Sequence, residues 1–90
     1  MTISYDPAKP EKTLAERGLD FADAGQVFAS LLIENPDDRF DYGENRFITV
    51  GLLGERMVVV VWTPRDGGRH IISMRKANER EQRRYGKQLG

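Results

Sequence analysis

The feature that most constrains the fold is an apolar run, Met57–Trp62, which has the length of a strand and contains four consecutive valines. A strand with one wet face alternates apolar and polar residues, and Val58–Val61 shows no such alternation. Turn residues bound the run, with Gly54-Glu55 before it and Pro64–Gly68 after it. The chain must therefore form a sheet in which this strand is central and covered, at least in part, on both faces.

The flanking segments predict the rest of one small domain, residues 1–90, because 90 residues are too few for two cores. Gly54-Glu55 predicts a hairpin, and Asn78 with Glu81 forms a capping box that opens a helix. The expected elements are an edge strand at 3–5, helices at 6–17 and 20–31, a strand at 31–34, a loop at 35–45, strands at 46–53, 56–63 and 69–75, and a helix at 78–85. This order predicts an α+β fold: two N-terminal helices, an antiparallel sheet of three to four strands and a C-terminal helix, with the helices segregated to one face.

Composition excludes several kinds of site. The chain has no cysteine and one histidine, so disulfides, thiolate nucleophiles and histidine-based metal clusters are ruled out, and we expect neither a metal nor a cofactor. No apolar run approaches the ~20 residues of a membrane span, and the N-terminus lacks the pattern of a secretion signal. We therefore expect a cytoplasmic protein.

The last predicted strand carries arginines on one face. Period-two alternation places His70, Ile72 and Met74 toward the core, and on the other side Arg69, Ile71, Ser73 and Arg75. Together with Arg65 and Lys76 these cations would suit phosphate oxygens, as in single-stranded RNA. The alternative is that the arginines pair with the acidic loop, which contains Asp37, Asp38, Asp41 and Glu44.

Other positions also have two interpretations. Glu44 and Arg46 lie two residues apart, which favours an ion pair over a general base beside a cation. His70 is expected to be a core or rim residue rather than a catalytic one. Trp62 and Tyr85 could stack on bases, although a packing role is favoured for each.

Charge is unevenly distributed along this chain of zero net charge. The first 64 residues hold six basic and eleven acidic residues, whereas the remainder holds eight basic and three acidic residues. In the last helix, four cations repeat at helical spacing and form one basic face, namely Arg80, Arg83, Arg84 and Lys87. This face predicts contact with a polyanion or an acidic partner, although a solvated helix face is the alternative.

Several segments together resemble the BrnT family of type II toxins, over nearly the whole chain. The most specific is Ile71-Ile72-Ser73-x-Arg75-Lys76-Ala77, followed by Glu81 and Tyr85. The others are Tyr5-Asp6-Pro7-Ala8-Lys9, Gly18-x-x-Phe21 leading to Ala24 and Val27-Phe28, Glu44-x-Arg46, Ile48-Thr49-Val50-Gly51, and Val60-Val61-x-Thr63-x-Arg65. The chain departs from the usual pattern in its first helix, where Thr13 replaces an Asn and Glu16-Arg17-Gly18 replaces a Lys-His-Gly step.

The resemblance implies a RelE-like fold, ribonuclease activity that arrests translation, and neutralisation by a BrnA antitoxin with a ribbon-helix-helix DNA-binding domain, so that DNA is contacted only through the antitoxin. With thiol, histidine-pair and metal chemistry disfavoured, we expect cleavage without metal by Glu44 as base, with Arg65, Arg75 and Lys9 as catalytic cations. The expected RNA-binding residues are Arg46, Arg69, Ser73, Lys76, Arg80, Arg83, Arg84 and Tyr85. The alternative is a non-enzymatic RNA- or protein-binding module, or an inactive toxin relative.

Overall fold

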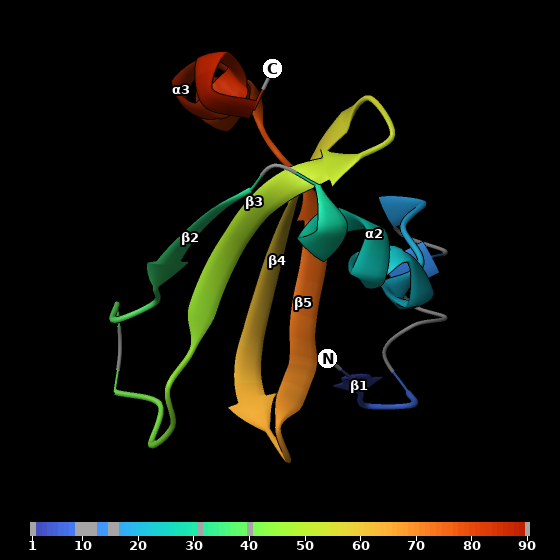
Figure 1. Cartoon of the computed structure of the whole chain (residues 1–90), viewed down its shortest axis with the longest axis vertical. Coiled ribbons are helices and arrows are strands. Elements are labelled where there is room, and N and C mark those ends of the chain that lie inside the picture. The colour runs from blue at the N-terminus through green and yellow to red at the C-terminus, as the bar shows by residue number, and fades with distance from the viewer. Residues whose placement is uncertain (1, 9–12, 15–16, 31, 40, 90) are drawn as a thin grey trace.

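The computed structural model describes residues 2–8, 13–14, 17–30, 32–39 and 41–89, which form a mixed α+β fold around a five-stranded sheet (Figure 1). The strand order is β1-β5-β4-β3-β2; β1 is parallel to β5 and every other neighbouring pair is antiparallel. The strands are β1 (Ile3–Tyr5), β2 (Ile33–Pro36), β3 (Phe47–Leu53), β4 (Arg56–Arg65) and β5 (Gly68–Lys76), and the helical elements are η1 (Phe21–Asp23), α2 (Ala24–Ala29) and α3 (Glu79–Leu89).

The valine run lies in β4 near the middle of the sheet, and the prediction that both of its faces are covered is confirmed. Val58 and Val60 belong to a core cluster that includes Phe21 of η1 and Val27 of α2. Val59 points the other way and packs in a second cluster on the opposite face, with Val50, Ala77 and, at its margin, Tyr85 of α3. The run therefore joins two apolar layers.

Two parts of the predicted architecture are wrong. The sheet has five strands rather than three to four, because the short segments at both ends of the order add as edge strands. The helices are not segregated to one face, because α2 covers one side of β4 while Tyr85 of α3 packs on the other. The physical reason is the second apolar cluster around Val59, which a helix must shield from water.

The helices differ in part from their predicted ranges. Of the first predicted helix, 6–17, the described residues Thr13, Leu14 and Arg17 are helical, and residues 9–12 and 15–16 lie outside the described residues. The predicted start at Asp6 is wrong: residues 6–8 are not helical, and the Asp6 carboxylate accepts a hydrogen bond from the Ala8 amide at 3.0 Å within a turn. The second begins as a 3-10 turn capped by Asp20, whose carboxylate accepts a hydrogen bond from the Ala22 amide, and it ends at Ala29. No helix within the described ranges is both long enough and apolar enough to cross a membrane.

The β3–β4 turn and the last capping box follow the sequence prediction. The β4–β5 turn is shorter than the predicted Pro64–Gly68, because Pro64 and Arg65 belong to β4 and Gly68 belongs to β5. Gly54 has φ +63 at the β3–β4 turn, and Asp66 and Gly67 have φ 52 and 75 at the β4–β5 turn. The Asn78 carboxamide accepts from the Glu81 amide at 2.8 Å, and the Glu81 carboxylate accepts from the Asn78 amide at 2.9 Å. These are local signals, and each is satisfied by the residues that carry it.

An irregularity in β5 overturns the predicted facing of its residues. Val61 lies opposite Ser73 and Trp62 lies opposite Ile71, so β5 advances two residues where β4 advances one. Such a bulge shifts the alternation by one residue. Ile71 and Met74 are consequently both in the core, and Arg69 lies on the core face with Ile71 while His70 does not.

Candidate functional site

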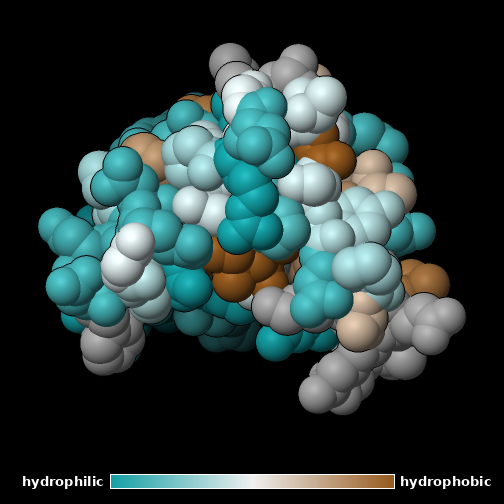
Figure 2. All heavy atoms as spheres, turned by 90° about the horizontal axis from the view of Figure 1, so that it is seen from below, coloured by the Kyte–Doolittle hydropathy of each residue, from teal (hydrophilic) through white to brown (hydrophobic). Residues whose placement is uncertain are grey.

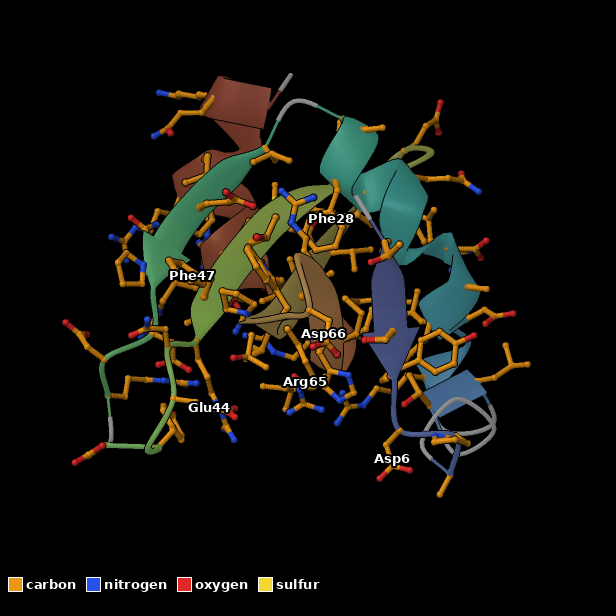
Figure 3. All side chains as sticks on the ribbon, turned by 60° about the horizontal axis from the view of Figure 1, so that its bottom comes forward. Asp6, Phe28, Glu44, Phe47, Arg65 and Asp66 are labelled. Atoms are coloured by element: carbon orange, nitrogen blue, oxygen red, sulfur yellow. The ribbon has the colours of Figure 1, made fainter. Side chains whose placement is uncertain are left out.

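A carboxylate and two guanidinium groups meet at the end of the sheet beside the β4–β5 turn, where Figure 3 shows Glu44 and Arg65. Nε of Arg46 donates to Oε2 of Glu44 at 3.0 Å, and Nη2 of Arg65 lies 3.9 Å from Oε1 of the same carboxylate. Glu44 and Arg46 directly precede β3 and Arg65 ends β4, so the hairpin register brings them together. The ion pair expected between Glu44 and Arg46 is present. We call these three residues the Glu44 cluster.

The loop behind the Glu44 cluster is built on a buried carboxylate. Asp37 accepts two hydrogen bonds from the Arg39 guanidinium, at 2.7 and 2.9 Å, and one from the Tyr42 hydroxyl at 3.2 Å. The Arg39 hydrogen bonds hold the pKa of Asp37 below its usual value. The same loop also holds Arg46 in place. The guanidinium carbon of Arg46 lies 4.0 Å from the centre of the Tyr42 ring, and its carbonyl accepts a hydrogen bond from the Asp37 amide at 2.7 Å.

The role of Arg39 was not predicted from the sequence. An aspartate and an arginine two residues apart in a loop are a signal, but a weak one, because most such pairs are exposed. In the structure, by contrast, the Asp37 side chain is only 1% exposed. The alternative in which the loop acids pair with arginines of the sheet holds for Glu44 with Arg65 and fails for Asp37.

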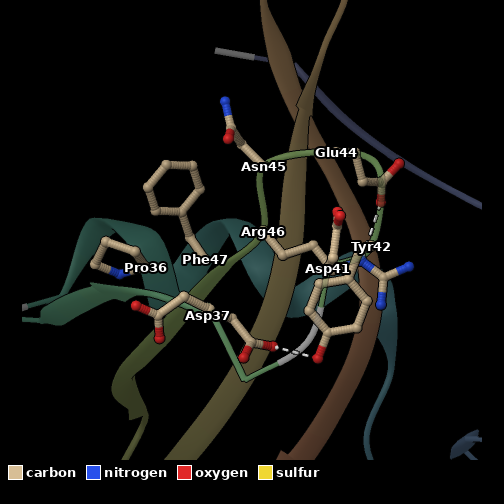
Figure 4. A pocket seen from close by; sticks show the side chains of 9 residues that line it. Pro36, Asp37, Asp41, Tyr42, Glu44, Asn45, Arg46 and Phe47 are labelled. Atoms are coloured by element: carbon tan, nitrogen blue, oxygen red, sulfur yellow. Dashed lines mark hydrogen bonds and ion pairs between the residues drawn. The ribbon is translucent and has the colours of Figure 1, made fainter.

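A hollow of about 390 Å³ opens beside the Glu44 cluster (Figure 4). Four acidic residues line the hollow, and Arg46 is the one basic residue among the described lining residues. A phosphate would therefore be repelled from the hollow and would bind more favourably on the side of the cluster where Arg65 lies. Figure 2, which views this end of the molecule, shows largely hydrophilic surface around a small apolar patch. The lining residues are Pro36, Asp37, Asp38, Asp41, Tyr42, Glu44, Asn45, Arg46 and Phe47.

Arg75 lies far from the Glu44 cluster and has a different partner. It is paired with Val59 in the sheet, six residues before Arg65 on β4, which corresponds to about 20 Å along the strand. Its two terminal nitrogens donate to the two carboxylate oxygens of Glu81, at 2.7 and 2.8 Å. These hydrogen bonds raise the pKa of Arg75 and lower that of Glu81. The structure therefore does not bring Arg75 together with Glu44 and Arg65.

Arg69 does not share a face with Ser73 and Arg75, as the simple alternation predicted, because the bulge intervenes. Its guanidinium carbon lies 4.2 Å from the Phe28 ring centre and 4.9 Å from that of Trp62. Nη2 of Arg69 lies 3.7 Å from the Glu34 carboxylate. The aromatic rings and the carboxylate together stabilise its charge within the core-facing side of the sheet.

The remaining predicted residues are spread along β5 and α3. Ser73 is half-buried and Lys76 is exposed at the end of β5; Lys9 lies outside the described residues. Tyr85 packs against the second core cluster, as favoured. The four predicted cations of α3 are all exposed, namely Arg80, Arg83, Arg84 and Lys87.

The aromatic and imidazole side chains divide between core and surface. Trp62 is a core residue, as favoured, and its indole donates to the Thr49 hydroxyl at 2.8 Å. His70 is half-buried on the face opposite Ile71, and its Nδ1 lies 2.9 Å from the hydroxyl of Ser4. The prediction that His70 points to the apolar face is wrong, again because of the bulge.

Comparison with models of known protein families identifies a match over most of the chain. Residues 5–81 match the family model described as the ribonuclease toxin, BrnT, of type II toxin-antitoxin systems. The chain belongs to the BrnT family. No individual curated protein matches it. The matched segment contains the Glu44 cluster, Arg75 and Glu81, and it ends inside α3.

One departure of this BrnT chain from the usual pattern has a structural role. The Arg17 guanidinium, at the position of the usual histidine, donates to the Met74 carbonyl at 3.0 Å and so ties the first helical segment to β5. In the described part of the chain, no three carboxylate or imidazole side chains are grouped in a way that could hold a metal ion.

Proposed function

We propose that this BrnT-family protein is a RelE-like endoribonuclease that cleaves RNA without a metal ion, using the Glu44 cluster. The observation that carries the proposal is the position of Glu44 between two guanidinium groups, 3.0 Å from Arg46 and 3.9 Å from Arg65. A carboxylate can take a proton, and guanidinium groups can neutralise a phosphate, so the cluster supplies a base and an anion site side by side.

The proposed reaction is attack by the RNA 2′-hydroxyl on the adjacent phosphate. Glu44 takes the proton of the hydroxyl, and Arg65, which is 48% exposed, leaves its more distant contact with Glu44 to meet the phosphoryl oxygens. Negative charge on those oxygens grows in the transition state, so a guanidinium there accelerates the reaction more than it strengthens binding. Arg46 holds Glu44 in place, because its guanidinium is fixed against the Tyr42 ring.

Arg75 enters this proposal as a structural residue. Its guanidinium is engaged by both oxygens of Glu81, so contact with a phosphate would require the loss of two hydrogen bonds of 2.7 and 2.8 Å. Lys9 and Lys76 contribute to RNA binding in this proposal through their positive charge. The exposed cations of α3 are proposed to attract the RNA backbone over a longer range.

The proposed biological setting is that of the family. The protein would arrest translation in the cytoplasm by cutting RNA, and a BrnA-like antitoxin with a ribbon-helix-helix domain would neutralise it. Co-expression with the neighbouring gene product, followed by size-exclusion chromatography, tests the partnership: one shared peak is expected, and separate elution of the two proteins contradicts it.

Cleavage of a labelled RNA in excess EDTA tests the reaction. We expect the wild-type protein to cut, and Arg65→Ala to cut about 100- to 1,000-fold more slowly, the usual cost of losing one donor to transition-state charge. Arg56→Ala is the matched control, because Arg56 is an exposed arginine at the opposite end of β4, and it should cut at the wild-type rate.

Two results would contradict the proposal: loss of cleavage in EDTA, and an Arg65→Ala protein that cuts as fast as the Arg56→Ala control. A wild-type protein that shifts RNA in a gel without cutting it would favour the alternative, a binding module that acts through the exposed cations of α3.

A further inference from the structure

A row of side chains crosses the sheet beside the Glu44 cluster. Thr63 of β4 is paired with His70 of β5, and His70 is paired with Ser4 of β1. On the other side, Phe47 is paired with Trp62, so the next position outward places Arg46 beside Thr63. The Thr63 hydroxyl donates to the Asn45 carbonyl at 2.6 Å, which shows that this segment stays alongside β4.

Side chains that lie directly opposite one another on neighbouring strands point to the same face. Arg46, Thr63, His70 and Ser4 therefore share a face, and with strands about 4.8 Å apart the backbones at Arg46 and His70 are about 10 Å apart. Arg65 lies two residues beyond Thr63 on the same strand, so it points to this face as well. The imidazole thus lies on the same side and at the same end of the sheet as the Glu44 cluster.

The bulge in β5 is what places His70 there. Without the register shift between Val61 and Trp62, strict alternation would put His70 on the face of Met74, inside the core. Bulges of this kind are frequent beside active sites because they redirect a side chain. The only histidine of the chain is in this way moved from the core to the face that carries Arg65.

Ser4 fixes the orientation of the imidazole. Its hydroxyl lies 2.9 Å from Nδ1, and β1 holds it in parallel register with β5. When the ring is protonated, Nδ1 donates to the Ser4 oxygen, and Nε2, which has no hydrogen-bond partner among the described residues, carries a second proton that can be given away. Imidazole is the side chain best suited to moving a proton near neutral pH.

We propose that His70 is the general acid of the cleavage reaction and that Ser4 is its positioning residue; this assignment rests on the proposed function. The 2′-oxygen gives its proton to Glu44 and forms a bond to phosphorus. The bond between phosphorus and the 5′-oxygen breaks, and the 5′-oxygen takes the proton of His70 Nε2. The products are a 2′,3′-cyclic phosphate and a 5′-hydroxyl. Protonated Glu44 then gives its proton to water, and neutral His70 regains one from water, so that both groups return to their starting states.

Replacement of the scissile 5′-oxygen by sulfur tests the general acid directly, because a thiolate leaves without being protonated. The cleavage site is first mapped with wild-type protein, and an oligoribonucleotide is then made with sulfur at that one bridging position. On ordinary RNA, His70→Asn should cut about 100- to 10,000-fold more slowly than wild type, the range for a general acid. On the sulfur substrate it should cut at close to the wild-type rate.

Three further variants sharpen the test. Glu44→Gln should be slow on both substrates, because the sulfur removes the need for a general acid but not the need for a general base. On ordinary RNA, Ser4→Ala should reduce the cleavage rate by less than His70→Asn does. On the sulfur substrate, Ser4→Ala should cut at close to the wild-type rate. If Ser4 had only a structural role, the variant would be equally slow on both substrates. Gln26→Ala, an exposed residue on α2, is the control and should match wild type on both substrates.

The outcomes separate this assignment from the proposed function. His70→Asn that is equally slow on both substrates, with an unchanged melting temperature, overturns the role of His70 as acid. So does His70→Asn that cuts ordinary RNA at the wild-type rate. If the wild-type protein cuts neither substrate, the proposed function itself is wrong, and the assignment of His70 falls with it.

Discussion

Removal of the Arg75 guanidinium is expected to loosen α3 from the sheet. Both terminal nitrogens of Arg75 donate to Glu81, at 2.7 and 2.8 Å, and this pair joins the end of β5 to the first turn of α3. The side chains are 42% and 21% exposed, so solvent screening reduces the value of the pair below that of a buried one. For a bidentate pair of good geometry at this exposure we expect a loss of about 1–2 kcal/mol in the free energy of unfolding.

A chain of 90 residues loses about 5 °C of melting temperature for each kcal/mol, so Arg75→Ala should melt about 5–10 °C below wild type. Arg83→Ala is the matched control, because it removes an exposed cation of α3 and should melt within about 2 °C of wild type. Glu81→Gln keeps an acceptor for the Asn78 amide and removes the charge. A double-mutant cycle of Arg75→Ala with Glu81→Gln isolates the interaction between the two side chains.

The pH dependence of the same pair has a definite sign. Arg75 lowers the pKa of Glu81 below its ordinary value of 4.5, so the ionised carboxylate stabilises the folded state above that pH. The stabilisation is lost as the pH falls through the lowered pKa. The melting difference between wild type and Glu81→Gln should therefore be constant above about pH 5 and should shrink below about pH 4.5.

A specific result would refute this reasoning. If Arg75→Ala melts like the Arg83→Ala control and yet cuts RNA about 100- to 1,000-fold more slowly than wild type, the guanidinium acts on the substrate. That is the outcome that the sequence alone predicts. Thermal denaturation and cleavage are measured on the same preparations, so that a loss of folded protein is not taken for a loss of catalysis.

Three other perturbations have expected outcomes. Asp37→Asn removes the buried carboxylate beneath the loop and should cost about 2–3 kcal/mol in urea unfolding at pH 7; because the pKa of Asp37 is lowered, that difference should vanish as the pH falls well below 3.8. Gly51→Ala places a methyl group 2.9 Å from two atoms of Val27 and should cost about 1–3 kcal/mol in thermal melting; an unchanged melting temperature would show that α2 shifts to make room. Combined Arg80→Ala and Arg84→Ala should weaken RNA binding in a filter-binding titration and reduce its dependence on salt; an unaltered salt slope would make this a solvated helix face.

The parts of the fold that the sequence predicts correctly are those fixed by neighbouring residues. The valine run of β4, the turn at Gly54 and the capping box of Asn78 with Glu81 each carry their own signal within a few residues. The parallel pairing of β1 could not be inferred in the same way. Three residues at the start of the chain pair with β5 more than sixty positions later, and no local pattern selects that partner.

The candidate site shows the same division. Glu44 and Arg46 are two residues apart, and their ion pair follows from that spacing. The faces on which Arg69 and His70 lie cannot be inferred from residue spacing, because they depend on a bulge in β5. The pattern of apolar and polar residues along β5 gives no sign of the extra residue. One extra residue reverses the side to which every later or earlier side chain points. A single register shift therefore reverses the facing of two functional candidates, Arg69 and His70, relative to the predicted pattern.

The described basic residues of this chain fall into two groups, those paired with a carboxylate and those exposed to solvent. Three arginines of β4 and β5 each meet a carboxylate, Glu44, Glu34 and Glu81 respectively, so their charges act at short range and in fixed geometry. The cations of α3 form no ion pair among the described residues, so their charge extends into solvent. α3 follows the far end of β5, about 26 Å along the strand from the β4–β5 turn (Figure 1). A bound RNA would therefore be attracted at one end of the sheet and cut at the other, and changes in α3 should alter KM while changes in the Glu44 cluster alter kcat.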